Sequence, residues 1–223
     1  DAKGRTVREG RLPDLTAPVD NGIPLGAIDI PLAGLPAPAK YNLEVVLTGT
    51  DAANDWDVWV YPESAPDPAG VLIATGLDPA TRAKLLDGAS VLLLPPAARI
   101  ESRGIETGFT PVFWNTAWAS GQKPETLGIL CKPEHPVFAQ FPTEYHQNWQ
   151  WWEVLKGAKV LVLDDQPADL RPLVQSIDTW FDNRRLGLLV EARVGKGRLM
   201  ISGMNMSDDP ATRPVARQLR GSL

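Results

Sequence analysis

Residues 71–94 constrain the fold of this chain more than any other segment, because they predict a strand, a helix and a second strand in succession. Residues 71–75 and 91–94 are short, mainly apolar runs typical of buried strands. Between them, Asp78 is placed to cap a helix over residues 78–86, and Pro79 suits the first turn of that helix. Two buried strands joined by a helix favour a parallel crossover unit, and therefore an α/β domain.

The later part of the chain adds further strands to this domain. Residues 159–163, KVLVL, are a third apolar run. Residues 187–194 and 198–202 flank the turn sequence Gly195, Lys196 and Gly197, which predicts a β-hairpin rather than a phosphate-binding loop. An amphipathic helix is predicted for the last residues, PVARQLRGSL. We therefore expect residues 64–223 to form an α/β module with a mixed sheet and an antiparallel edge.

The first 63 residues predict a separate β-rich piece. Residues 41–48 alternate with the period of two expected of a half-buried strand, and residues 56–61 form a second strand-like run. Two strands are too few for a complete β-sandwich of about seven. We interpret residues 1–63 as the last strands of a sandwich, or as a β-rich lead-in, within a longer polypeptide whose upstream domains are the expected partners. The polar, turn-rich residues 63–70 predict the boundary.

Composition and charge exclude several classes of partner. With 223 residues, of which 43% are hydrophobic, the chain is long enough to bury a core. Its formal net charge of -5 and its lack of a long basic run argue against nucleic-acid binding, which needs clustered positive charge. Its apolar runs are far shorter than the roughly 18 to 20 residues that cross a bilayer, so we expect no membrane span.

Residues 141–152, FPTEYHQNWQWW, are the strongest indication of function. They hold three of the eight tryptophans and one of the two histidines. A solvated loop rarely carries so much aromatic surface, because each large ring loses roughly 1.5 to 3 kcal/mol when it stays in water. The rings of this segment are therefore expected either in a core or on a binding surface.

Both interpretations of this aromatic segment stay open. Sugars pack their C–H groups on aromatic faces and hydrogen-bond to neighbouring polar side chains, and the segment supplies both kinds of group. Alternatively, Trp149 and Trp152 share one side of a helical turn while Trp151 points elsewhere, so packing against a core or another domain accounts for two or three rings. The side chains that would contact an oligosaccharide are Glu144, Tyr145, His146, Asn148, Trp149, Trp151 and Trp152, joined by Trp114 and Asn115 from the upstream motif FWNTAW.

Four longer motifs suggest a family. They are WDVWVYP at 56–62, FWNTAW at 113–118, TLGILCKPEHPVFAQFPTEYHQNWQWW at 126–152 and NRRLGLLVEARVGKGRLMISGMNM at 183–206. Together they resemble the C-terminal region of large exported, β-galactosidase-like bacterial proteins of glycoside hydrolase family 2. The resemblance implies that the catalytic carboxylates lie on a separate upstream barrel. It also implies a three-layer, flavodoxin-like module similar to class I glutamine amidotransferases and to β-galactosidase trimerisation domains.

Catalysis within this chain has weak support from its residues. Amidotransferase chemistry needs a thiolate on a tight, glycine-flanked turn, whereas Cys131 stands between Leu130 and Lys132. Glycosidase chemistry needs a pair of carboxyl groups, and Asp164 with Asp165 also fits a solvated turn after a strand. The carboxylates considered for this chemistry are Glu144, Glu153, Asp164, Asp165, Asp178 and Glu191. We expect a non-catalytic module that docks on the parent protein or mediates homo-oligomerisation, with sugar binding and independent hydrolysis as alternatives.

Metal and cofactor sites are not predicted. His135 and His146 lie eleven residues apart, without a second ligand at helical metal-site spacing except Glu144 close to His146. A single cysteine, Cys131, excludes an internal disulfide and an all-cysteine metal site. Each histidine is expected to be a structural residue or a hydrogen-bond donor in a pocket wall. A periplasmic or secreted location follows from the family resemblance alone.

Overall fold

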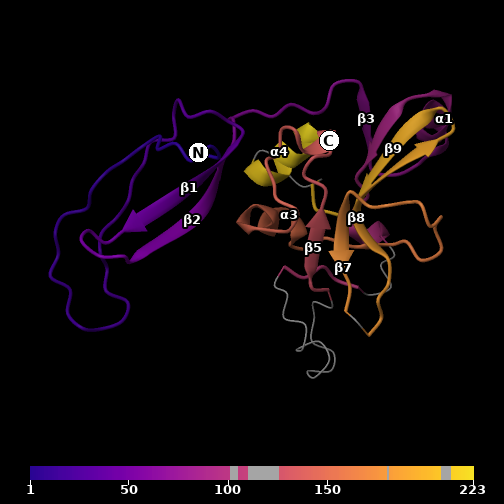
Figure 1. Cartoon of the computed structure of the whole chain (residues 1–223). Helices are drawn as coiled ribbons and strands as arrows, with labels where there is room; N and C mark the ends of the chain where they lie inside the picture. The colour runs from indigo at the N-terminus through magenta and orange to yellow at the C-terminus, as the bar shows by residue number, and fades with distance from the viewer. Residues whose placement is uncertain (101–104, 110–125, 180, 207–211) are drawn as a thin grey trace. The chain divides into compact units, whose positions relative to one another are not determined.

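The structure is a computed structural model, and it describes residues 1–100, 105–109, 126–179, 181–206 and 212–223. The chain divides into two compact units, Asp1–Pro62 and Glu63–Leu223, called unit 1 and unit 2 below. Each unit has its own sheet (Figure 1).

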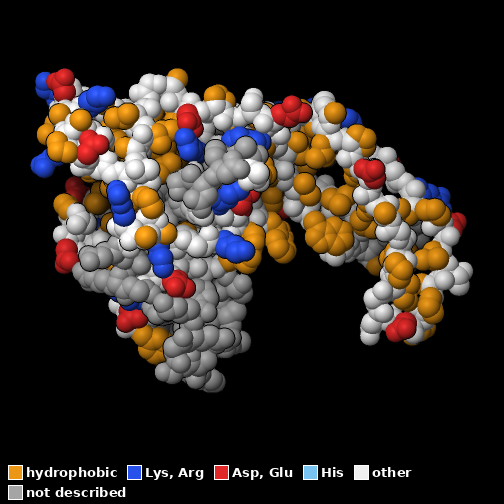
Figure 2. All heavy atoms as spheres, turned by 180° about the vertical axis from the view of Figure 1, so that it is seen from behind, with side chains coloured by type: hydrophobic (Ala, Val, Ile, Leu, Met, Phe, Trp, Pro, Cys, Tyr) orange, Lys and Arg blue, Asp and Glu red, His pale blue; other side chains and the backbone are white. Residues whose placement is uncertain are grey.

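Unit 1 is built around one antiparallel hairpin. Strands β1 (Ala39–Val46) and β2 (Ala53–Val60) pair along their whole length, which confirms both strands predicted in this region. Tyr41 is buried, and its hydroxyl donates a hydrogen bond to the carbonyl of Pro36 at 2.7 Å. Many other apolar side chains of unit 1 stay on its surface (Figure 2). The larger of these exposed side chains are Leu15, Val19, Leu25, Ile28, Leu32, Val46, Leu47, Trp56 and Val58.

Unit 2 contains a mixed sheet with seven described strands. Along the sheet the order is β3-β4-β9-β8-β7-β5, and β6 pairs with β8 outside this path. Strands β3, β4 and β9 are parallel to one another, while β8, β7, β6 and β5 make antiparallel pairs. The strands are β3 (Val71–Ala74), β4 (Ser90–Leu93), β5 (Gly128–Cys131), β6 (Leu161–Val162), β7 (Val174–Ile177), β8 (Leu186–Val194) and β9 (Gly197–Ser202).

Helix α1 (Pro79–Asp87) connects β3 to β4 and confirms the predicted parallel crossover. The carboxylate of Asp78 caps the helix by accepting a hydrogen bond from the Thr81 amide at 2.7 Å. Gly88 ends the helix with a φ of 123°, a backbone conformation that favours glycine. Leu85 then packs into a small core with Val91 and Leu199.

The hairpin of β8 and β9 is held against the end of α1. The amides of Lys196 and Arg198 donate hydrogen bonds to the carbonyls of Leu86 and Ala89, at 3.2 and 3.1 Å. A side chain at position 197 would overlap the Leu85 carbonyl of α1, and its Cβ would lie 2.5 Å from the carbonyl oxygen of Ala89, two residues after the helix. The glycine at this position therefore lets the hairpin approach the helix closely. The predicted Gly195-Lys196-Gly197 hairpin turn is confirmed.

The other helices of unit 2 among the described residues are short. They are α3 (Trp152–Leu155), α4 (Pro214–Ser222) and the 3₁₀ turns η1 (Ala97–Arg99), η2 (Pro136–Phe138) and η3 (Trp149–Trp151). Helix α4 confirms the predicted terminal helix, and α3 and α4 lie next to each other (Figure 1). The carboxylate of Glu153 on α3 accepts a hydrogen bond from the Ala216 amide at 3.0 Å, so a negative charge meets the start of α4.

The predicted α/β class with a mixed sheet is confirmed at this level for unit 2. The predicted strand at 159–163 is shorter in the structure, Leu161–Val162, and it joins the sheet beside the first residues of β8. Among the described helices, none is both long and apolar enough to cross a membrane.

Candidate functional site: the aromatic segment beside β5

The aromatic segment runs along the outer edge of β5, the last strand of the sheet order. The amide of Cys131 donates a hydrogen bond to the carbonyl of Tyr145 at 2.8 Å, and His146 forms an isolated antiparallel bridge with Leu130. An uncovered edge strand would offer unpaired backbone groups to other chains. This segment therefore covers the edge of β5.

The side chain of Gln147 completes this edge. Its Oε1 accepts a hydrogen bond from the Ile129 amide at 2.9 Å, and its Nε2 donates one to the carbonyl of Phe109 at 2.9 Å. Gly128 has a φ of +133°, and a Cβ there would overlap the Gln147 amide group. A glycine next to Ile129 therefore makes room for the amide of Gln147.

Asn148 turns the chain from the β5 edge into η3. Its Oδ1 accepts a hydrogen bond from the Trp149 amide at 2.8 Å. Its Nδ2 donates to the Glu144 carboxylate at 3.3 Å, which joins the two ends of this short stretch. Because η3 continues directly into α3, Trp149 and Trp152, three residues apart, share one side of the backbone and Trp151 points to another.

Trp151 belongs to the core of unit 2. Its side chain is fully buried, and its Nε1 donates a hydrogen bond to the Thr143 hydroxyl at 2.9 Å. The ring packs edge-to-face against Phe138 and Phe141, with centroid distances of 6.2 and 5.2 Å. The sequence included Trp151 among the candidate ligand contacts, whereas the structure buries the ring and leaves no face open to a ligand.

Three rings of the same segment face solvent, and we call them the aromatic surface. Tyr145, Trp149 and Trp152 are 64%, 69% and 51% exposed. Phe109 supports Trp152 through an edge contact at a centroid distance of 5.3 Å. His146, half-buried, contacts the Tyr145 ring at 4.7 Å, and its Nδ1 lies 3.0 Å from the carbonyl of Gln147. Trp114 and Asn115, predicted to join these residues, lie outside the described residues.

Cys131 occupies a site that opposes ionisation of its thiol. The residue is 8% exposed, and its Sγ donates a hydrogen bond to the carbonyl of Glu144 at 2.7 Å. Burial, reinforced by the charges of Glu134 and Glu144, raises the pKa of Cys131 to about 11, although a hydrogen bond with Thr143 acts in the opposite direction. The nucleophilic thiolate is therefore scarce at neutral pH.

The candidate carboxylates hold the fold together. Asp178 accepts hydrogen bonds from Nε and Nη2 of Arg184 at 2.7 and 2.9 Å. Burial opposes the charge of Asp178, but these bonds and those from backbone amides outweigh burial and lower its pKa. Asp164 accepts a hydrogen bond from the Arg185 amide at 2.8 Å, as expected for a turn after a strand.

Both histidines also have structural roles. Nδ1 of His135 accepts a hydrogen bond from the Val137 amide at 3.4 Å at the start of η2. Its Nε2 lies 3.6 Å from the Glu191 carboxylate. Within the described ranges, no three histidine, cysteine or carboxylate side chains gather in a way that could hold a metal ion.

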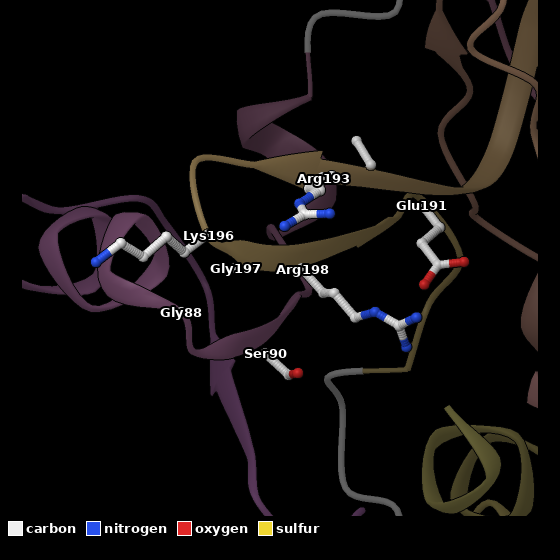
Figure 3. A pocket seen from close by; sticks show the side chains of 8 residues that line it. Gly88, Ser90, Glu191, Arg193, Lys196, Gly197 and Arg198 are labelled. Carbon is white, nitrogen blue, oxygen red and sulfur yellow. The ribbon is translucent and has the colours of Figure 1, made fainter.

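The structure adds a groove that sequence reasoning did not identify. A cavity of about 550 Å³ opens over β4, β9 and β8 (Figure 3). Its polar lining includes Ser90, Glu191, Arg193, Lys196 and Arg198. A sequence signal existed, because a two-residue hairpin turn at Gly195 and Lys196 places the residues two before and two after it opposite each other. These residues are the two arginines, Arg193 and Arg198.

Family comparisons divide the chain at nearly the same place as the structure. One family model, "Domain of unknown function (DUF8487)", matches residues 72–223. The chain belongs to the DUF8487 family. A second model, "Domain of unknown function (DUF8488)", matches residues 1–62, the residues of unit 1. The DUF8487 match covers the seven described strands of the larger sheet except the first residue of β3.

A search of curated proteins finds no match to the chain. The descriptions of DUF8487 and DUF8488 name no activity, so the resemblance to glycoside hydrolase family 2 proteins stays a prediction. The residues of this DUF8487 module are therefore the guide to its function.

Proposed function

We propose that this chain is a non-catalytic accessory module of an exported, β-galactosidase-like protein that takes part in carbohydrate breakdown. Its role is to dock on the other domains of that polypeptide or to mediate homo-oligomerisation. The observation that carries the proposal is the environment of Cys131, a thiol that is buried, hydrogen-bonded to a carbonyl and raised in pKa to about 11. A cysteine nucleophile needs the opposite environment.

The roles of the carboxylates support the same proposal. Asp178 binds Arg184, Asp164 accepts from the Arg185 amide, and Glu153 accepts from the first amides of α4. Each of these carboxylates is held by the fold, whereas a glycosidase needs one carboxyl group free to donate a proton and another free to act as nucleophile or base.

The finer fold and the location are parts of the proposal. We infer a three-layer, amidotransferase-like arrangement for unit 2 from the parallel strands β3, β4 and β9 with the crossover helix α1. A periplasmic or secreted location follows from the family resemblance of the motifs at 126–152 and 183–206. A fold of this type does not by itself carry an activity.

Turnover assays with the full chain test the proposal. Chromogenic galactosides and glucuronides, together with a glutamine amide substrate, are expected to show no turnover above the background of buffer. Cys131→Ala and Asp164→Asn variants are expected to give the same background. Turnover that is present in the unaltered chain and lost in either variant would contradict a non-catalytic role.

A second function, carbohydrate binding, is favoured by the aromatic surface. Trp149 and Trp152 are more than half exposed although each ring loses free energy in water. Polar groups adjoin them, since Glu144 and Asn148 are joined by a hydrogen bond within the same segment. Flat rings beside hydrogen-bonding groups are what a pyranose face requires.

Isothermal titration with galactosides, glucuronides and plant oligosaccharides tests this second function. Trp149→Ala and Trp152→Ala are expected to weaken saturable binding about tenfold or more, since each removes a stacking face. Trp56→Ala is a matched control, because Trp56 is also an exposed tryptophan, 44% exposed, but lies in unit 1. Unchanged binding in both segment variants would show that the rings serve another contact.

A further inference from the structure

The groove over β4, β9 and β8 carries an inference beyond the proposed function. We propose that this groove binds a small ligand through an oxyanion group, a carboxylate, sulfate or phosphate, held by Arg193 and Arg198. The two arginines are direct cross-strand partners on β8 and β9. Both line the cavity of about 550 Å³, a volume typical of sites for small molecules.

Within the described part of the chain, the side chains of Arg193 and Arg198 form no ion pair. Like charges directly opposite each other on a sheet destabilise it. Both side chains are exposed, and neither has an ion pair or hydrogen bond to a described residue. By contrast, Arg184, Arg213 and Arg220 each pair with a carboxylate. A bound oxyanion would supply the missing charge to Arg193 and Arg198.

The described charged side chains of the lining carry more positive than negative charge. Lys196 adds a third positive charge, and its contact with Asp87 is long, at 3.8 Å, and exposed. Among the described residues of the lining, Glu191 supplies a carboxylate, and it lies 3.6 Å from Nε2 of His135. Figure 3 shows Glu191 further along β8 from Arg193, with Arg198 extending toward it. An oxyanion held by both arginines would therefore lie away from Glu191, which bounds the far end of the groove.

A hydroxyl completes the row of groups that would contact an oxyanion. Ser90 on β4 is the parallel partner of Arg198 on β9, and Arg198 is the partner of Arg193 on β8. Because paired residues point to the same face of a sheet, all three side chains stand in one row across the groove (Figure 3). Guanidinium forks bind planar and tetrahedral oxyanions through two parallel hydrogen bonds, and a hydroxyl adds a further donor.

The backbone that carries Arg193 and Arg198 is fixed before any ligand binds. The hairpin turn is fixed to α1 by hydrogen bonds from the amides of Lys196 and Arg198. Gly197 allows this close approach because a Cβ there would meet the α1 backbone. A ligand would therefore order two side chains and no backbone segment, which lowers the entropic cost of binding.

Calorimetric titration of the full chain at low salt tests the proposal. The probes are sodium sulfate, inorganic phosphate and glucuronate, with glucose as the neutral control and chloride salt for ionic strength. We expect saturable binding of at least one oxyanion and none of glucose. The Arg193→Gln/Arg198→Gln double variant is expected to weaken binding about tenfold or more, as for the loss of two charge-assisted contacts. Strongest binding of sulfate or phosphate would identify a tetrahedral anion, and strongest binding of glucuronate an acidic sugar.

A matched control variant and a thermal melt show whether weaker binding comes from the loss of the two arginines or from unfolding. Arg82→Gln removes an exposed arginine of α1 that does not line the groove, and it should bind as the unaltered chain does. The double variant should melt at the same or a higher temperature, because it relieves a like-charge pair. The proposal is overturned if no oxyanion binds below about 10 mM, or if the double variant binds as well as Arg82→Gln. Trp149→Ala should not change oxyanion binding, which separates this site from the aromatic surface.

Discussion

The side-chain amide of Gln147 takes the place of a neighbouring strand beside Ile129. Its Oε1 accepts a hydrogen bond of 2.9 Å from the Ile129 amide, which would otherwise donate to a neighbouring strand. Its Nε2 donates a hydrogen bond of 2.9 Å to the carbonyl of Phe109. Ile129 itself is fully buried, so an unpaired amide there would be costly. The side chain of Gln147 therefore links the edge strand β5 to the carbonyl of Phe109, which lies 38 residues before Gln147 in sequence.

Gln147→Leu is expected to lower the free energy of unfolding by about 2 to 4 kcal/mol, because it leaves two backbone groups near β5 unpaired. Urea denaturation followed by circular dichroism measures this change. Gln175→Leu is the matched control, since Gln175 is exposed on β7, and it should change stability by less than about 0.5 kcal/mol. Equal effects of the two substitutions would contradict the role of Gln147.

The three tryptophans of the aromatic segment should differ in their effect on stability. Trp151→Ala removes a fully buried ring and its hydrogen bond to Thr143, and is expected to cost about 3 to 5 kcal/mol. Trp149→Ala removes a ring that is 69% exposed and should cost less than about 1 kcal/mol. Thermal melts of both variants test the difference. A large loss for Trp149→Ala would mean that this ring is packed and not a free surface.

The Cys131 thiol should make stability fall at alkaline pH. Its folded pKa of about 11 is above the 9.0 of an unperturbed thiol, so the folded state holds the proton more tightly than the unfolded chain does. The contribution is fully present below pH 9 and is lost as pH rises toward 11, about 2 to 3 kcal/mol in all. Denaturation at pH 8 and pH 10.5 should show this loss in the unaltered chain and a smaller one in Cys131→Ala. Identical pH dependence would contradict the raised pKa.

Asp178 should affect stability in acid. Burial opposes its charge, but the bonds from Arg184 lower its folded pKa, so the folded state binds its proton less tightly than the unfolded chain does. Its contribution is therefore present at neutral pH and is lost as pH falls below about 4 through the folded pKa. Asp178→Asn is expected to cost about 3 kcal/mol at pH 7 by leaving Arg184 without its buried partner. Asp169→Asn, at an exposed position, is the control. The difference in urea midpoint between Asp178→Asn and the unaltered chain should be large at pH 7 and should shrink as the pH is lowered below about 4. A difference that does not change with pH would contradict the lowered pKa of Asp178.

Gly197→Ala should disrupt the contact between the β8–β9 hairpin and α1. Its Cβ would lie 2.5 Å from the Ala89 carbonyl oxygen and nearer still to that of Leu85, so backbone must shift. We expect a loss of about 3 kcal/mol or more in the free energy of unfolding. Gly10→Ala, where no atom lies within 4 Å of the added Cβ, should be nearly neutral. A neutral Gly197→Ala would show that the hairpin moves away from α1 without cost.

Local sequence patterns predicted the parts of the fold that depend on neighbouring residues. Asp78 and Pro79 defined the start of α1, and the Gly195-Lys196-Gly197 turn defined the β8–β9 hairpin. Capping and turn chemistry act within a few residues, so the sequence alone carries them. The order of the strands was not predictable in this way, because β9 inserts beside β4 although more than one hundred residues separate them. Long-range pairing depends on which apolar faces fit together, and no local pattern records that fit.

The sequence by itself determined that Trp149 and Trp152 share one side of a turn and that Trp151 points to the other. Only the tertiary structure decided which side is buried, because Phe138 and Phe141 provide the core that receives Trp151. Likewise, the hairpin turn determined that Arg193 and Arg198 are cross-strand partners. Only the tertiary structure placed β4, with Ser90, beside β9 and so formed the groove that these side chains line. The physical reason is the same in both cases. Periodicity sets the direction of a side chain relative to its own backbone, while burial depends on the elements that pack against it.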